Sequence, residues 1–176
     1  GVLVNTAGFL QATAEDAGQE SVDKVTNRVE VVNTHGVVGL NDTISNVTMT
    51  VRLAAGSSAV DMDTTSIKYL SDTNVTTLTN SSDSTTFPAG DKDEFNLTAV
   101  DGTDDDNSFG VLNSGDDRYE VTINASAIKG GDQYNGLTTG TQVQLDITSQ
   151  TGGTTTVIET MHQQLAGKSA GEPVKL

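Results

Sequence analysis

Residues 44–53 read ISNVTMTVRL, and this stretch decides the class of fold. From Met49 to Leu53, apolar and polar side chains alternate at every position. A period of two is typical of a strand, because successive side chains of a strand point to opposite faces of its sheet. We therefore expect a long strand here and a β-rich fold around it.

The same alternation recurs after Arg28. The other segments that we expect to be strands are 29–31, 67–69, 95–97, 119–123, 143–147 and 154–161. Turn clusters separate them at His35-Gly36, 56–58, 113–117 and 151–153, and residues 79–94 are predicted to form a polar surface loop. Short strands with regular turn signals favour an antiparallel sandwich or barrel, and we expect an immunoglobulin-like β-sandwich over residues 28–176.

Residues 1–27 are predicted to form one α-helix ahead of this β domain. Small or apolar side chains recur there at steps of three and four, which places them on one stripe of a helix. The stripe consists of Leu3, Ala7, Leu10, Ala14, Ala17 and Ser21. Residues 1–10 are apolar on nearly all sides, and charged side chains begin at Glu15. Such a helix packs either on its own domain or against copies of itself.

The charge of the chain restricts its partners. It carries 24 Asp and Glu against 9 Lys and Arg, a formal net charge of −15. This argues against binding to nucleic acid, which requires cationic side chains to displace counterions from phosphates. The excess of acidic residues fits a protein of high-salt surroundings, where salt screens the self-repulsion, although an acidic domain at low salt is the alternative.

The sequence gives little support for catalysis or for a membrane span. It has no Cys, so a disulfide, a thiolate nucleophile and a Cys-ligated metal are excluded. His35 and His162 lie far apart in the sequence and match no metal or triad spacing, so we expect no enzyme and no required cofactor. The apolar stretch of residues 1–10 is shorter than the roughly 20 residues that cross a bilayer.

An acidic run could hold a hard cation. Ca²⁺ takes oxygen ligands from flexible loops, and the candidate ligands are Asp101, Asp104, Asp106 and Asp116. The run does not match an EF-hand, because Gly110 comes one position late and Gly115 stands where the closing Glu belongs. The alternative is a solvated acidic loop.

Asn-x-Ser/Thr motifs mark candidate sites of N-linked glycosylation. They occur at Asn41, Asn46, Asn74, Asn80, Asn96 and Asn124. Asn96 and Asn124 fall on the polar phase of their predicted strands, so we expect both to face solvent. Occupied sites would place the domain outside the cell. The alternative is that Asn and Thr are simply abundant in this chain.

Blocks along the whole chain resemble archaeal flagellins (archaellins), particularly those of haloarchaea. The N-terminal blocks are NTAGFLQ at 5–11, GQES at 18–21 and VTNR at 25–28. Later blocks are 61–70, DDDNS at 104–108 with VLN at 111–113 and DDRYE at 116–120, and a closing segment from TTT at 154–156 to LAGKSA at 165–170. Family members carry about 20 further apolar residues before the position of Gly1, which this sequence lacks.

The resemblance implies a structural subunit of the archaellum, the swimming filament of archaea. It implies a type IV pilin-like helix, continuing an upstream apolar helix, in the filament core, and an outer β-sandwich that carries N-linked glycans. The residues that we expect to pack between subunits are Val2, Leu3, Val4, Ala7, Phe9, Leu10, Ala14 and Ala17.

The implied partners are copies of the chain, other archaellins and the archaellum motor and assembly machinery. The implied location is extracellular, with membrane contact only as a precursor. Two alternatives remain. One is an adhesive type IV-like pilin, and the other is an extracellular β-sandwich module that binds a cation or a carbohydrate.

Overall fold

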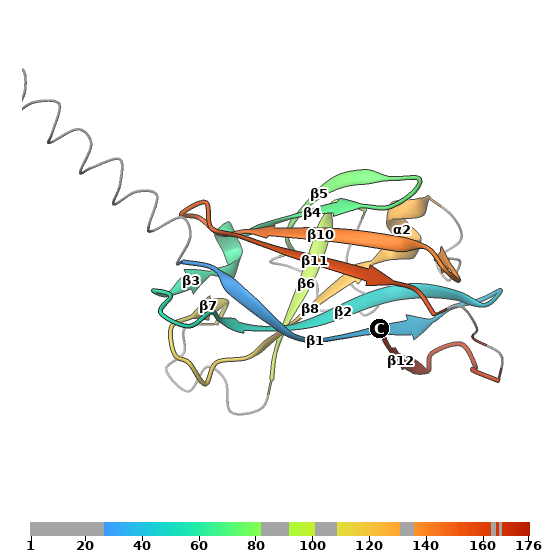
Figure 1. The fold of residues 1–176 in the computed structure, drawn as a ribbon, viewed down its shortest axis with the longest axis horizontal. Coiled ribbons are helices and arrows are strands. Elements are labelled where there is room, and N and C mark those ends of the chain that lie inside the picture. The colour runs from blue at the N-terminus through green and yellow to red at the C-terminus, as the bar shows by residue number, and fades with distance from the viewer. Residues whose placement is uncertain (1–26, 82–91, 101–108, 131–135, 163–164, 166) are drawn as a thin grey trace, which may run out of the picture.

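The computed structural model describes residues 27–81, 92–100, 109–130, 136–162, 165 and 167–176 (Figure 1). All of the predicted N-terminal helix except Asn27 lies outside these residues. Nearly all the regular structure that is described consists of strands, so the prediction of a mainly β protein is confirmed. No helix in the described ranges combines the length and the apolar character needed to cross a membrane.

The elements follow one another closely along the chain. The strands are β1 (Val29–Val38), β2 (Thr43–Leu53), β3 (Val60–Asp61), β4 (Ser66–Leu70), β5 (Val75–Asn80), β6 (Glu94–Ala99), β7 (Val111–Leu112), β8 (Tyr119–Asn124), β9 (Leu137–Thr138), β10 (Gln142–Thr148), β11 (Thr154–Thr160) and β12 (Pro173–Lys175). The helical elements are the 3₁₀ turn η1 (Met62–Thr64) and the short helix α2 (Ala125–Lys129).

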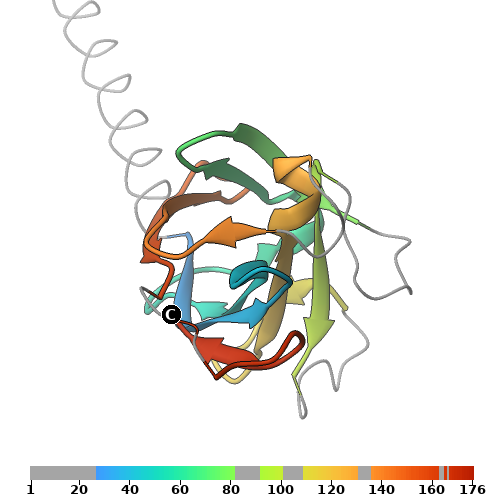
Figure 2. The same cartoon turned by 90° about the vertical axis from the view of Figure 1, so that its right-hand side faces the viewer.

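A single curled sheet contains most of these strands. Its order is β11-β10-β4-β5-β6-β8-β2-β1-β12, with β9 paired to the start of β2, while β3 and β7 form a separate small sheet. Every pair described is antiparallel except β5–β6, which is parallel. Figure 2 shows the strands wrapping around a common interior. The immunoglobulin-like sandwich therefore remains a prediction.

Strand β2 lies within the sheet between β1 and β8. Its apolar side chains Val47, Met49 and Val51 are almost fully buried, as the alternation predicts. The polar phase is also buried at Asn46 and Thr48. On that half of the strand, Ser126 Oγ of α2 donates a hydrogen bond to Ser45 O, and β9 pairs with Thr43 and Ile44. The first half of β2 is thus covered by elements that are distant in sequence.

The predicted turn at His35-Gly36 is wrong, because both residues lie inside β1. Gly36 is there for a packing reason: a Cβ at this position would lie 2.8 Å from Ile44 Cγ2. The predicted loop at 79–94 is wrong at its ends, since Thr79 and Asn80 belong to β5 and Glu94 belongs to β6. Residues 82–91 lie outside the described part.

Candidate functional site

The segment that leads from the N-terminal residues into the sheet is held by hydrogen bonds on several sides. The carbonyl oxygen of Asn27 accepts from Ser149 Oγ at 2.7 Å and from Thr151 Oγ1 at 3.3 Å, both in the turn between β10 and β11. Its side-chain Oδ1 accepts from Ser58 N at 3.0 Å. We call Asn27 with these three partners the junction.

The residues after Asn27 extend the same attachment. Arg28 O accepts from Ala54 N at 3.1 Å, and Thr155 Oγ1 of β11 donates to Val29 O of β1. Glu30 pairs with Arg52 at 2.9 Å, and the hydrogen bond and charge of Arg52 lower the pKa of Glu30. Asn27 and Arg28 thus bind both the segment that follows β2 and the β10–β11 turn, so a force on the N-terminal segment reaches two separate parts of the fold.

Every residue predicted for subunit packing, from Val2 to Ala17, lies outside the described residues. The same holds for Asp101, Asp104 and Asp106 of the predicted cation site. Asp116 is exposed, and its neighbour Asp117 instead stabilises a turn, since Asp117 Oδ2 accepts from Asn113 N and Ser114 N at 3.0 Å. Among the described residues, no three acidic, His or Cys side chains are grouped to hold a metal. The cation site therefore stays a prediction.

Among the six candidate glycosylation sites, Asn41 is exposed and lies at the tip of the β1–β2 hairpin. Its φ of 58° and that of Asp42, 55°, put both residues in the left-handed region that tight hairpin turns require. Asn and Asp tolerate this conformation better than most residues. A glycan attached at Asn41 would project from the end of the hairpin into solvent.

Three of the candidate glycosylation sites, Asn74, Asn80 and Asn96, are half-buried. Asn74 Nδ2 donates to Ile128 O at 3.0 Å, and Asn80 Nδ2 donates to Asp63 Oδ1 at 2.5 Å. Glycosylation replaces one of the two hydrogens on this nitrogen, so a glycan at either residue leaves a single N–H for the contact and must fit beside the partner residue. Asn96 is half-buried on β6.

Asn46 and Asn124 are buried, with exposed fractions of 5% and 7%. The expectation that Asn124 faces solvent is wrong, because its Oδ1 accepts from Ala127 N at 3.1 Å and caps α2. A strand residue that ends its strand and starts a helix no longer follows the alternation. Whether any of the six motifs carries a glycan stays a prediction.

Several exposed apolar side chains escaped the sequence analysis. They are Val32, Leu40, Val75, Phe109 and Ile158. A signal existed for Ile158, because Val157 and Ile158 are adjacent in a strand and only one of two neighbours can face the interior. Where such side chains lie together in one patch, they are candidates for contacts with another molecule.

Comparisons with known proteins agree with one another. The family model described as archaeal-type flagellin matches residues 1–159. Flagellin A2 of Haloferax volcanii is 62% identical over 190 residues, covering 100% of this chain and 86% of that protein.

Two solved structures share the fold. The crystal structure of an archaeal flagellin from Methanocaldococcus jannaschii superposes with a TM-score of 0.68 at 16% identity, covering 84% of this chain and 94% of that one. The archaeal flagellum of Methanospirillum hungatei superposes with a TM-score of 0.57 at 17% identity, covering 94% and 84%.

Proposed function

This chain belongs to the archaeal-type flagellin family, and on that premise we propose that residues 1–27 hold it in the filament while residues 28–176 form the outer domain. The chain is a structural subunit of the archaellum, a motility filament built of archaellin subunits, and it is not an enzyme. Its filament belongs to the cell surface.

The spacing of apolar residues before Ala17 supports the assignment of residues 1–27. Small side chains at Ala7, Ala14 and Ala17 allow helices to approach closely, and the apolar residues around them need neighbours to cover them. Copies of the chain supply such neighbours in a heterologous, open assembly. A type IV pilin-like helix with an immunoglobulin-like outer domain is the finer architecture that we propose.

The junction is the observation that carries this proposal. A filament that turns must pass torque from its core to its shell without a loose connection. The bonds from Asn27 to Ser149 and to Ser58 fix the first described residue to the β10–β11 turn and to the loop between β2 and β3. The outer domain would then move as one body with the segment that precedes it.

The acidic composition supports high-salt surroundings. The likeness to a flagellin of Haloferax volcanii supports an extracellular location. We further propose that N-linked glycans decorate the shell, beginning with the exposed Asn41. The archaellum motor and assembly machinery are the proposed further partners, as expected of a subunit that must be exported and turned.

Cryo-electron microscopy of filaments sheared from cells at high salt tests the proposal. The expected result is a helical reconstruction that fits this chain, with residues 1–27 toward the axis. Charged substitutions, Leu3→Glu and Leu10→Glu, are expected to abolish assembly, whereas Asn33→Glu on an exposed position of β1 serves as the matched control. Assembly of both N-terminal variants at the control level would contradict the role of residues 1–27.

A further inference from the structure

One row of side chains crosses four neighbouring strands on the outer face of the sheet. Val75 of β5 lies opposite Leu70 of β4, Leu70 opposite Gln144 of β10, and Gln144 opposite Ile158 of β11. Directly opposed residues of antiparallel strands point to the same face. Val75 is 67% exposed and Ile158 is 55% exposed. We call these four residues the stripe.

The stripe borders a shallow hollow of about 330 Å³, which could receive a side chain from another molecule. The hollow is lined by Leu70, Ser71, Asp72, Gln142, Gln144 and Ile158. The next row on the same face is polar and consists of Thr77, Lys68, Asp146 and Thr156. The apolar surface is therefore bounded, and the exposed Lys68 stands beside it.

A second apolar surface lies elsewhere on the molecule. Phe109 is 54% exposed, and its ring meets the ring of Tyr119 edge-on, with centroids 5.5 Å apart. Tyr119 is buried, and its hydroxyl accepts a hydrogen bond from Gly110 N at 2.9 Å. This bond holds the backbone next to Phe109 in place. The exposed Asp63 lies beside it, since a Cβ on Gly110 would be 3.4 Å from Asp63 Oδ1.

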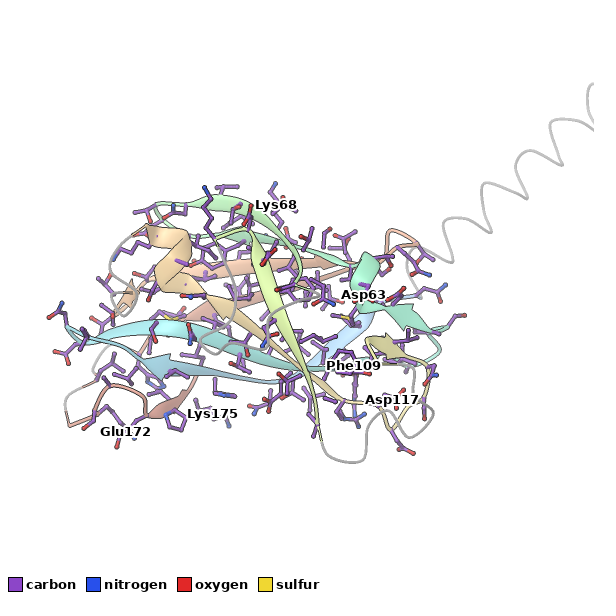
Figure 3. The ribbon with its side chains drawn as sticks, turned by 180° about the vertical axis from the view of Figure 1, so that it is seen from behind. Asp63, Lys68, Phe109, Asp117, Glu172 and Lys175 are labelled. Carbon is purple, nitrogen blue, oxygen red and sulfur yellow. The ribbon has the colours of Figure 1, made fainter. Side chains whose placement is uncertain are left out.

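The two surfaces belong to opposite ends of the molecule. Asn74, in the turn that joins the strands of Leu70 and Val75, bonds to Ile128 O of α2. Phe109 directly precedes Gly110 and β7. Figure 1 shows α2 and β7 at opposite ends of the long axis, and Figure 3 shows Phe109 close to the same end as Asp63.

We propose that Phe109 of one copy packs into the hollow beside the stripe of a neighbouring copy in the filament, with Asp63 near the neighbour's Lys68. This inference rests on the filament function proposed above. Because the two surfaces differ, the contact is heterologous and can repeat along an open helical polymer. Every copy carries both surfaces.

Salt favours this occupant. A second copy carries the same net charge of −15, and Asp72 lines the hollow while Asp146 lies beside Lys68, so Lys68 offsets the repulsion between copies only locally. At molar salt the Debye length is about 3 Å, and long-range charge effects fade. Burial of an aromatic ring against apolar side chains keeps its strength under those conditions.

Helical reconstruction of unmodified filaments gives the first test. The expected result places the Phe109 ring within about 4.5 Å of Leu70 or Ile158 of a neighbour, the distance of apolar contact. A reconstruction that contains this chain but keeps Phe109 away from every neighbour's stripe overturns the inference and leaves the filament function intact. Filaments without this chain contradict the filament function itself.

Cross-linking gives an independent test, because the chain has no Cys of its own. A chain with Phe109→Cys and Ile158→Cys is assembled into filaments and oxidised. The expected result is that the monomer band is replaced by a ladder of covalent oligomers. A disulfide forms only when the two Cα atoms come within about 7 Å, so the ladder reports that the two positions lie close together in neighbouring copies.

The matched control combines Phe109→Cys with Val32→Cys, which is 50% exposed on β1 and outside the stripe. An equal ladder in the control would count against the contact. If the test variant gives no ladder or does not assemble, the reconstruction of unmodified filaments decides, because Phe109→Cys also removes the ring that makes the contact.

Discussion

The carbonyl oxygen of Asn27 lies 2.7 Å from the hydroxyl oxygen of Ser149, a residue 122 positions further along the chain. Ser149 is 6% exposed and follows β10 directly, so its rigid surroundings position the hydroxyl. Thr151 donates to the same carbonyl at 3.3 Å. The turn between β10 and β11 thus supplies two of the three bonds that form the junction.

Ser149→Ala is expected to lower the free energy of unfolding by about 1 kcal/mol, because a buried hydroxyl bond is lost while Thr151 still reaches the carbonyl. Denaturant unfolding at high salt measures the change. Thr160→Ala, at an exposed position on β11, is the control and should stay within about 0.5 kcal/mol of the parent. Equal stabilities of the two variants would show that the Ser149 bond contributes nothing.

Gly136→Ala is expected to destabilise the fold by about 3 kcal/mol, at the upper end of overpacking effects. A Cβ at this position would lie 1.8 Å from Ile44 O, a backbone atom that cannot move without disturbing the β2–β9 pairing. Gly115→Ala is the matched control, since nothing lies within 4 Å of a Cβ there. Thermal unfolding compares the two, and similar melting temperatures would disprove the close approach.

The local alternation predicted the strands that have one clean apolar face, such as Tyr119 to Ile123 in β8. The alternation did not predict strands whose position in the fold is set by contacts with residues distant in the sequence. Strand β5 was missed because Val75 and Leu78 are three residues apart and therefore face opposite sides. The two-residue strands β3, β7 and β9 are too short to show any period.

The candidate site was less predictable than the fold. The motif Asn-x-Ser/Thr marks six acceptors equally, yet Asn124 caps a helix and Asn41 lies exposed at a hairpin tip. Nothing local in the sequence indicates that Ser149 binds Asn27, because that contact exists only once the sheet has curled. The exposed Phe109 likewise depends on its packing against Tyr119.

The stability of the chain is expected to fall at alkaline pH because of Tyr69. Burial raises the pKa of Tyr69 from its ordinary value of 10.0 to about 12. Between these values the unfolded chain releases the phenolic proton while the folded chain retains it. The free energy of unfolding should therefore decrease by about 1.4 kcal/mol per pH unit above pH 10 and level off near pH 12.

Tyr69→Phe isolates this contribution from other groups that titrate in the same range. The variant keeps the buried ring, so its free energy of unfolding should fall less steeply between pH 10 and 12 than that of the parent. Urea unfolding at a series of pH values measures both slopes. Parallel curves would mean that Tyr69 ionises at the same pH in the folded and unfolded chains.

Glycan attachment to the folded chain is expected to favour Asn41 over Asn46 and Asn124. Asn41 is exposed at the hairpin tip, whereas the other two are buried, and Asn124 Oδ1 accepts the bond from Ala127 N that caps α2. Mass spectrometry of peptides from native filaments measures occupancy at each position. Asn41→Gly should remove one glycan mass while preserving the hairpin, because Gly adopts a φ near 58° without strain.

Asn124→Ala is the variant to compare with Asn41→Gly, because it removes a buried glycosylation motif instead of an exposed one. Loss of the cap should lower the free energy of unfolding by about 1 kcal/mol and leave the glycan mass unchanged. Thr43 is unsuitable for removing the Asn41 motif, because its Oγ1 bonds to Leu40 O and Gly136 N, so substitution there would disturb the fold as well. A glycan found on Asn124 of assembled filaments would require attachment before α2 forms, and would reverse the order of sites that burial predicts.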